Sequence, residues 1–306
     1  MKQPWKAYLK AGIVQFMAYP QVMKGEGPVY ETVKKIVDDE FFGSVEITHI
    51  ADVNERKRVA QILATGHIEV GYGAQPVLLS NKLDINSLNP DERRRAMDRV
   101  KLAIDEAYEV GAGKLAVLSG KDVARPDRAR ATALLVASLK EMCAYAASKG
   151  TLTIVLETFD DVVDKKCLIG PSTAAAEVAA AVRAEHSNFG LMVDLSHIPM
   201  LNETSIECLA AVRDYLVHVH VGNCLFNQPG HPADGDQHPR FGIPGGKNDV
   251  PELAEFLRGL FAIGYLGDRK AFLPTVAFEV KPLPGEDSDV LVAGTKRAFE
   301  EAWALV

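Results

Sequence analysis

Eight short apolar runs alternate with longer amphipathic segments along the 306 residues of this chain. Such alternation is typical of repeated βα units, whose strands form a parallel sheet. Several runs are apolar at consecutive positions, as expected when helices cover one face of a sheet and a barrel interior fills the other. A chain of this length buries a full core in one domain. We therefore predict an α/β fold, a (βα)8 TIM barrel spanning residues 1–306 as a single domain, with strands at 11–17, 44–50, 68–74, 114–120, 152–158, 189–195, 215–221 and 274–280.

Helix signals lie between these runs. Asn89 is placed as an N-cap before Pro90 at the first helical position, and Gly111 is placed to end that helix. A second amphipathic segment, 129–150, stops at a glycine in the same way. Two further helices are expected to open at Pro171-Ser172 and at Asp249, where a proline stands just inside the start.

One connection breaks this rhythm. After the seventh run come 28 residues, Gly222 to Asp249, that are rich in Gly, Pro, His and Asp. A connection of that length without regular structure is usually functional or disordered in a compact domain. Because it follows a barrel strand at the end where barrel active sites are built, we expect a loop that covers the substrate, with its His-rich part at 227–249.

Composition excludes several classes of protein. The formal net charge is −7 and the longest basic cluster is short, so a surface that binds nucleic acid through its net field is not expected. No run approaches 18 apolar residues, and the N-terminus lacks the pattern of a signal peptide, so we expect no membrane span and a cytoplasmic location. The four cysteines form no CxxC pair, and we expect free thiols.

Four apolar runs in the second half each end in a residue that can bind a divalent metal ion. These residues are Glu157, Asp194, His220 and Glu279. Polar residues at the carboxyl ends of barrel strands face one common mouth, where chemistry takes place. Three oxygen ligands and one imidazole suit Mn²⁺, Mg²⁺ or Co²⁺ better than a thiolate-seeking ion. For each carboxylate taken alone, a salt bridge at the rim of the barrel explains the sequence equally well.

Other polar residues near the strand ends are open to more than one interpretation. His218 and His220 alternate on one strand and point to the same face, so one is expected to bind the metal while the other packs behind it or contacts substrate. Glu46 and His49 close the second run and either contact substrate hydroxyls, support the metal ligands or form a stabilising pair at the rim. Lys281 either pairs with a carboxylate or holds an anionic oxygen of the substrate.

The segments LETF, VDLSH, HVHVGN and FEVKP resemble the xylose isomerase-like superfamily of metal-dependent sugar isomerases and epimerases, which includes the endonuclease IV branch. The resemblance covers almost the whole chain. It implies that Glu157, Asp194, His220 and Glu279 bind one ion, Mn²⁺ above all. It also implies that the two glutamates exchange a proton on either face of the substrate carbon, and that His197 supports this catalytic centre.

The chain departs from the ketose 3-epimerases of that superfamily at two points. Phe226 stands where they carry a substrate-contacting arginine, and the loop 227–249 is longer than theirs. The segments 164–171, 235–246 and 278–286 look closer to the catalytic subunits of bacterial C-glycoside deglycosidases, which act on 3-oxo-glycosides together with a small partner subunit. On that resemblance, one of two loop histidines, His231 or His238, serves as an acid–base group for the leaving aglycone. Otherwise both are expected to be solvent-exposed.

The function predicted from the sequence is therefore a metal-dependent sugar isomerase or epimerase that removes a proton next to a sugar carbonyl through a metal-stabilised enediolate. The alternative is a carbon–carbon lyase, the catalytic subunit of a C-glycoside deglycosidase. Two further hypotheses are a phosphodiesterase and a non-enzymatic barrel that only binds sugar or a partner. Expected partners are a small sugar or glycoside, and either further copies of the chain or a small second subunit.

Overall fold

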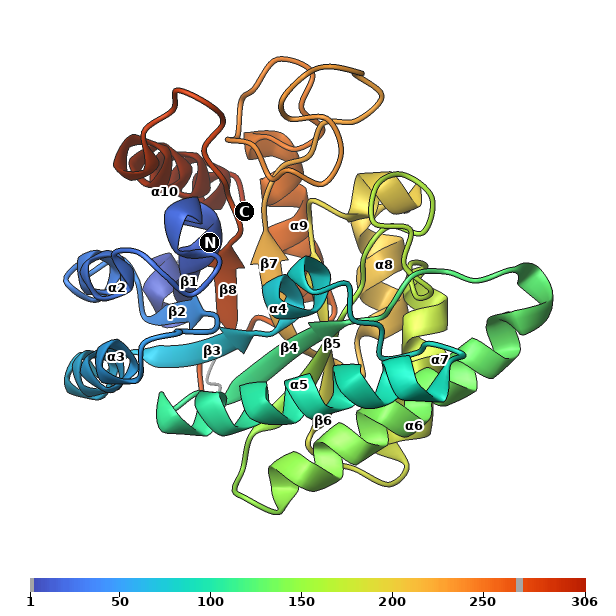
Figure 1. Cartoon of the computed structure of the whole chain (residues 1–306). Helices are drawn as coiled ribbons and strands as arrows, with labels where there is room; N and C mark the ends of the chain where they lie inside the picture. Colours follow the sequence, from blue (N-terminus) through green and yellow to red (C-terminus); the bar gives the residue numbers. More distant parts are fainter. Residues whose placement is uncertain (1–2, 268–271) are drawn as a thin grey trace.

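The eight strands close into one parallel barrel. The computed structural model describes residues 3–267 and 272–306. Each strand pairs with its neighbour in sequence, and β1 pairs with β8 to complete the cylinder. The predicted TIM barrel is therefore confirmed (Figure 1). The strands are β1 (Lys10–Val14), β2 (Ser44–Ile47), β3 (Glu69–Gly73), β4 (Lys114–Leu118), β5 (Thr153–Glu157), β6 (Phe189–Asp194), β7 (Leu216–Val221) and β8 (Thr275–Phe278).

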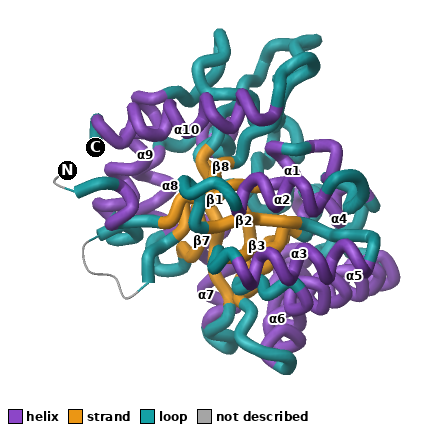
Figure 2. The backbone as a smooth tube through the Cα atoms, turned by 90° about the vertical axis from the view of Figure 1, so that its left-hand side faces the viewer, coloured by secondary structure: helices purple, strands orange, loops and turns teal. Residues whose placement is uncertain are grey.

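Helices surround the strands on the outside, as Figure 2 shows with the strands enclosed in the middle. The long ones are α2 (Val29–Val37), α3 (Val53–Thr65), α5 (Pro90–Glu109), α6 (Arg128–Ala147), α7 (Ser172–Arg183), α8 (Ser205–Val212), α9 (Val250–Ala262) and α10 (Ser288–Ala304). Two short helices, α1 (Gln15–Ala18) and α4 (Gln75–Ser80), follow β1 and β3. Single 3₁₀ turns lie at Trp5–Ala7, Pro20–Val22, Arg125–Asp127 and Ile198–Leu201.

The helix ends follow the local sequence. The Asn89 side chain accepts hydrogen bonds from the backbone of the first turn of α5, and Gly111 adopts a φ of 75° just after its end, both as predicted. Thr204 and Glu207 form a reciprocal capping box at the start of α8. Segment 11–17 is the exception among the predicted strands, because its second half leaves the sheet at Val14 and continues as α1.

The connection from β7 to α9 contains no helix or strand, in agreement with the prediction of a long loop. It packs on a small apolar cluster of its own, formed by Leu225, Ala233 and Ile243. The Asn248 amide ties its end to the barrel through the backbone oxygens of Leu195 and Gly222. The loop is therefore held in a defined conformation, and Figure 1 shows it beyond the end of β7.

All four cysteines are buried and free, as expected from their spacing. Within the described part of the chain, no helix combines the length and the apolar character that a membrane span needs.

Candidate metal centre

The four predicted metal ligands converge at the carboxyl ends of β5 to β8. Ligand atoms of Glu157, Asp194, His220 and Glu279 all lie within 4.8 Å of one another, and all four side chains are buried. The imidazole Nδ1 of His220 lies 2.5 Å from Oε2 of Glu279 and 3.7 Å from Oε1 of Glu157. Glu157, Asp194 and His220 end their strands or lie near the end, and Glu279 directly follows β8, so all four side chains meet at the mouth of the barrel. The sequence prediction that they meet at one point is matched by this geometry.

Two oxygens in this cluster are left without a hydrogen-bond partner. They are Oε1 of Glu157 and Oδ2 of Asp194, each fully buried and each without a hydrogen bond from any described residue, although histidine nitrogens lie 3.6 to 3.9 Å away. Buried polar atoms are almost always satisfied, so an orphaned pair of carboxylate oxygens indicates that a further group completes the site. Three carboxylates and one imidazole form a donor set that suits a hard divalent cation. The residues therefore fit the metal ion that the sequence predicts.

Crowding of negative charge shifts the pKa values of these groups. Burial, followed by the neighbouring carboxylate of Glu279, raises the pKa of Glu157 to about 8. Burial and Glu279 also raise the pKa of Asp194. Burial alone would lower the pKa of His220, but Glu46 and Glu279 beside it raise the pKa well above its ordinary value. The site is thus short of positive charge, which a divalent ion would supply.

Glu46 lies beneath this centre inside the barrel. Its carboxylate oxygens are 2.9 and 3.0 Å from Nε2 of His220, and Oε1 is also 2.7 Å from Nε2 of His218. Of the roles considered for Glu46, its position matches support of the metal ligands. His218 correspondingly packs behind His220.

His49 is not brought to the centre, so of the three roles considered for it the geometry does not favour contact with substrate. Its Nδ1 lies 2.8 Å from Oε2 of Glu106 on α5, and Tyr72 donates a second hydrogen bond to the same carboxylate. Strand β2 ends at Ile47, so the alternation that turns Glu46 inward no longer governs His49. A stabilising pair is the role that this geometry fits.

A second cluster lies beside the first and joins the long loop to the barrel. His197 donates from Nδ1 to the backbone oxygen of Thr158 at 2.8 Å, and its Nε2 lies 3.1 Å from Oδ1 of Asp236. The Nε2 of His238 is 2.9 Å from the same oxygen, and the ammonium of Lys165 is 2.9 Å from the other. Ligand atoms of Asp194, His197 and His238 also lie within 4.8 Å of one another.

The pKa values in this second cluster follow from the Asp236 carboxylate. Burial would lower the pKa of His197, but Asp236 raises it to about 10. Burial would likewise lower the pKa of His238, and Glu279 and Asp236 raise it to about 9. Burial would raise the pKa of Asp236, yet His238, His197 and Lys165 hold it well below its usual range. Hydrogen bonds to charged partners therefore keep this cluster ordered.

The expectation of solvent exposure is wrong for His238 and correct for His231. Only 2% of His238 is exposed, because the loop turns back over the barrel mouth and places it against Asp236 and Ser196. His231 lies on the outer part of the loop and is exposed. Sequence reasoning missed Asp236 and Lys165 altogether. The spacing Asp236-Gln237-His238 was a signal, because it could have placed two polar side chains on one side of an extended segment.

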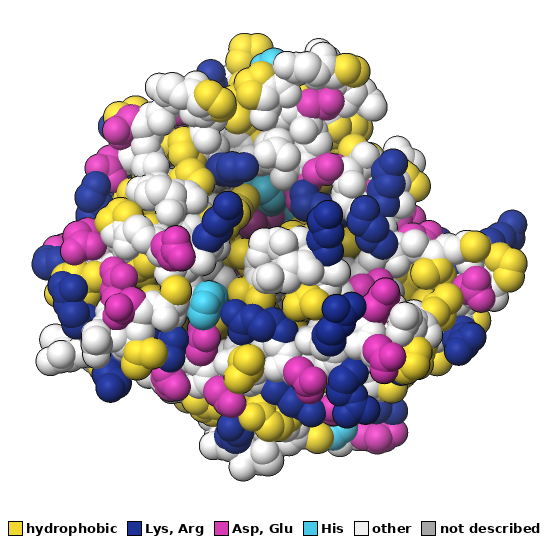
Figure 3. Space-filling model, in the orientation of Figure 1, with side chains coloured by type: hydrophobic (Ala, Val, Ile, Leu, Met, Phe, Trp, Pro, Cys, Tyr) yellow, Lys and Arg dark blue, Asp and Glu magenta, His cyan; other side chains and the backbone are white. Residues whose placement is uncertain are grey.

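A cavity of about 400 Å³ opens above the metal centre. Figure 3 shows it as a hollow near the middle of the view, with histidine at its floor and basic side chains around it. Lys281 lies at its wall, where its ammonium is 3.2 Å from the amide oxygen of Gln237. Much of the remaining lining is apolar and comes from Phe16, Met17, Met23, Pro76, Leu79 and Phe159. A volume of this size accommodates a small organic substrate.

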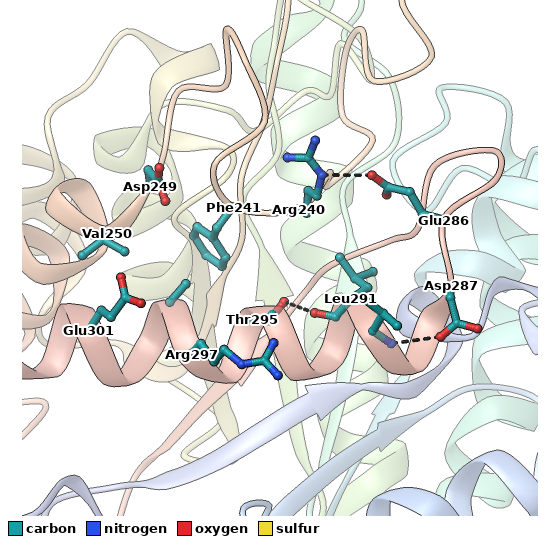
Figure 4. A pocket seen from close by; sticks show the side chains of 13 residues that line it. Arg240, Phe241, Asp249, Val250, Glu286, Asp287, Leu291, Thr295, Arg297 and Glu301 are labelled. Carbon is teal, nitrogen blue, oxygen red and sulfur yellow. Dashed lines mark hydrogen bonds and ion pairs between the residues drawn. The ribbon is translucent and has the colours of Figure 1, made fainter.

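A separate cavity of about 460 Å³ lies away from the barrel mouth, between the long loop and α10 (Figure 4). Arg240 from the loop bonds Glu286 there at 3.0 Å, and Phe241 projects toward α10. The ion pair anchors the outer part of the loop. The lining includes none of the predicted metal ligands.

Comparison of this fold with solved structures finds sugar epimerases among many similar barrels. The D-psicose 3-epimerase of Clostridium cellulolyticum H10 has a TM-score of 0.68 at 18% identity, covering 97% of this chain and 99% of that one. The 3-keto-D-glucoside 4-epimerase of E. coli has a TM-score of 0.64 at 17% identity, covering 97% and 98%. The IOLI protein, solved with a zinc atom, has a TM-score of 0.67 at 14% identity, covering 97% and 96%.

At these identities the structural likeness establishes the fold alone. No curated protein sequence matches the chain. The model of one protein family does match, over residues 41–267. This chain belongs to the xylose isomerase-like TIM barrel family.

Proposed function

We propose that this protein is a divalent-metal-dependent enzyme of the sugar isomerase and epimerase type, which removes a proton from the carbon next to a sugar carbonyl. The observation that carries the proposal is the pair of carboxylate oxygens without a hydrogen-bond partner, one on Glu157 and one on Asp194. Glu157 lines a cavity of substrate size, and Asp194 lies in the same cluster. The epimerases among the similar structures support the choice of reaction class.

Glu157, Asp194, His220 and Glu279 would hold the ion, with Mn²⁺ as our first choice and Mg²⁺ or Co²⁺ as alternatives. When bound, a divalent ion supplies Lewis-acid polarisation of the substrate carbonyl, which makes the neighbouring C–H bond more acidic. The IOLI protein was solved with zinc, which supports a cation site in this type of barrel.

Two glutamates provide the acid–base groups. Glu157 and Glu279 come from β5 and β8, which are not neighbours in the barrel, so their carboxylates approach a bound substrate from different sides. The Oε2 of Glu157 accepts a hydrogen bond from the Gln75 amide at 2.7 Å, which leaves Oε1 to take up a proton. Removal of a proton by one carboxylate and its return by the other inverts the carbon between them.

The rest of the cavity positions the substrate. The apolar wall excludes water from the reacting carbon, while Lys281 and Gln237 offer polar contacts on the side of the long loop. His197 and His238, both bonded to Asp236, hold this side of the cavity in place.

A second candidate function is carbon–carbon cleavage of a 3-oxo-glycoside. His238 is the observation that favours it, because this loop histidine lines the cavity within 3.7 Å of Glu279. Removal of the C2 proton by a glutamate would give an enolate, whose electrons expel the aglycone by breaking the C1–C bond. The imidazolium of His238 would then protonate the aglycone carbon. A small second subunit belongs to this candidate, and further copies of the chain to either.

Proton exchange in D₂O tests the reaction class. The metal-loaded protein is incubated with a panel of ketoses and 3-oxo-glycosides, with and without EDTA, and deuterium at the carbon next to the carbonyl is measured by mass spectrometry. We expect metal-dependent uptake that is lost in Glu279→Gln and kept in Glu106→Gln, which alters a partly buried glutamate outside the site. Uptake without aglycone release supports an isomerase or epimerase, and aglycone release supports the lyase. Absence of uptake from every substrate overturns both.

A further inference from the structure

A chain of polar side chains crosses the barrel interior beneath the metal centre. The Lys114 ammonium lies 3.5 Å from Nδ1 of His218, whose Nε2 lies 2.7 Å from Oε1 of Glu46. Glu46 in turn contacts Nε2 of His220 at 2.9 Å. Strands β2 and β7, which carry Glu46 and the two histidines, are not neighbours in the sheet, so these contacts pass through the centre of the cylinder.

The interior of a TIM barrel is normally filled by layers of bulky apolar side chains. Here Glu46, His218 and His220 are each at most 5% exposed. Burying such groups is costly unless they are hydrogen-bonded, and a series of bonds that satisfies each of them is expected to serve a specific arrangement.

The donors and acceptors of this chain permit one consistent assignment. Lys114 donates to Nδ1 of His218, and His218 donates from Nε2 to Glu46. A carboxylate only accepts, so His220 must also donate from Nε2 to Glu46. By the same rule Nδ1 of His220 donates to Glu279 at 2.5 Å in the metal-free protein, so both ring nitrogens carry a proton there. When a cation takes the place of the proton on Nδ1, the bond to Glu46 keeps the remaining proton on Nε2.

The neighbouring strand makes room for this arrangement. Gly71 on β3 stands beside Glu46 in the sheet register. A Cβ atom at Gly71 would lie 2.7 Å from Cγ of Glu46, which is closer than real Cβ contacts come. Cγ lies near the start of the side chain, so Glu46 would have to move as a whole. The absence of a side chain at position 71 therefore preserves the position of Glu46.

We propose that Glu46 is a positioning residue, which fixes the ring and the tautomer of His220 so that Nδ1 is presented to a divalent cation. Metal-binding histidines generally donate their other N–H to a carboxylate or carbonyl, which orients the ring. The inference rests on the proposed function to the extent that the centre holds such an ion. It does not depend on which reaction follows.

Cation affinity tests the role of Glu46 without reference to activity. Nε2 of His220 contacts both oxygens of Glu46, so in Glu46→Gln either orientation of the amide places an NH2 group against that N–H donor. We therefore expect the Kd for Mn²⁺, measured by calorimetry, to rise roughly 10- to 100-fold. Glu106→Gln is the matched control. It makes the same change at a glutamate that also accepts from an imidazole, His49, but outside the barrel, and it should leave the Kd unchanged.

Gly71→Ala tests the same inference through the space that Glu46 occupies. It touches neither His220 nor the cation, yet we expect it to raise the Kd for Mn²⁺. In a Glu46→Ala background the clashing Cγ is gone, so the further effect of Gly71→Ala should largely disappear. An equal effect of Gly71→Ala in both backgrounds would show that it acts on the sheet and not through Glu46.

The wild-type protein offers a measurement that needs no variant to fold. With Zn²⁺ bound as a diamagnetic probe, ¹⁵N NMR of the His220 ring should show a proton on Nε2 and none on Nδ1. A proton on Nδ1, or an unchanged Kd in Glu46→Gln, overturns this inference while leaving the proposed function standing. Cation binding with the expected tautomer but no proton exchange with any sugar overturns the proposed function alone. A wild-type protein that binds no divalent cation overturns both.

Discussion

Replacing Glu157 with glutamine should make the metal-free protein more stable. The folded state raises the pKa of this carboxyl from 4.5 to about 8 through burial and the proximity of Glu279. A raised pKa means that ionisation of Glu157 opposes folding, so stability falls as the pH rises above 4.5 and levels off near 8. Glutamine keeps the bond from Gln75 and carries no charge at any pH.

The size of the effect follows from the same values. Each pH unit between the two pKa values costs the folded state about 1.4 kcal/mol, so at pH 7 the carboxyl destabilises the metal-free fold by roughly 3 kcal/mol. With an unfolding entropy of about 2 cal/mol/K per residue, the 306-residue chain changes its Tm by about 5 °C for that free energy. With the divalent ion bound the sign reverses, because the variant lacks one ligand.

Thermal unfolding of both proteins between pH 5 and pH 8, in EDTA and in excess Mn²⁺, measures this. The advantage of Glu157→Gln in EDTA should grow with pH. Glu106→Gln is the control of opposite sign, because burial raises the pKa of Glu106 but hydrogen bonds from His49 and Tyr72 lower it below its ordinary value. A Glu157→Gln variant that is less stable in EDTA by the same amount at every pH would refute the reasoning and identify Glu157 as part of a structural ion pair.

Two further predictions concern the cation and the long loop. With free Mn²⁺ at about 100 times its Kd, removal of the ion should lower the free energy of unfolding of the wild-type protein by about 2.7 kcal/mol. This corresponds to a fall of roughly 4 °C in Tm, which added Mn²⁺ should restore and which should be absent in Asp194→Asn. Lys165→Met removes the ammonium that bonds Asp236. It should raise KM for the substrate several-fold while changing kcat less, and it should speed proteolytic cleavage within 222–249. An unchanged KM and an unchanged cleavage rate would show that the other anchors hold the loop.

The barrel and the meeting of the four candidate metal ligands at its mouth could be predicted because both depend on repetition. The alternation of apolar runs and amphipathic segments specifies the βα units, and closure of the sheet brings the carboxyl ends of all strands to one mouth. Glu157, Asp194, His220 and Glu279 each stand at such an end, so no detailed side-chain geometry was needed to place them together.

The contributions of the loops could not be predicted in this way. His238 has a φ of 50°, in the left-handed region that non-glycine residues seldom adopt, and its burial depends on contacts with Asp236 and Ser196 that no periodicity encodes. His49 shows the same difficulty in reverse. It lies three residues from Glu46 in sequence, but the chain has left the strand, and a partner on a distant helix decides where its ring points.

The strands and the long loop supply different groups of residues to the barrel mouth, so each group can be changed separately by mutation. The residues proposed to hold the cation lie on the barrel strands or directly after them, whereas Asp236 and His238 lie on the long loop, which is anchored by the Asn248 amide and by ion pairs. We expect that this loop can be exchanged as one unit. Exchanging 222–249 for the corresponding segment of another barrel should transfer substrate preference and leave the proposed metal-binding residues in place.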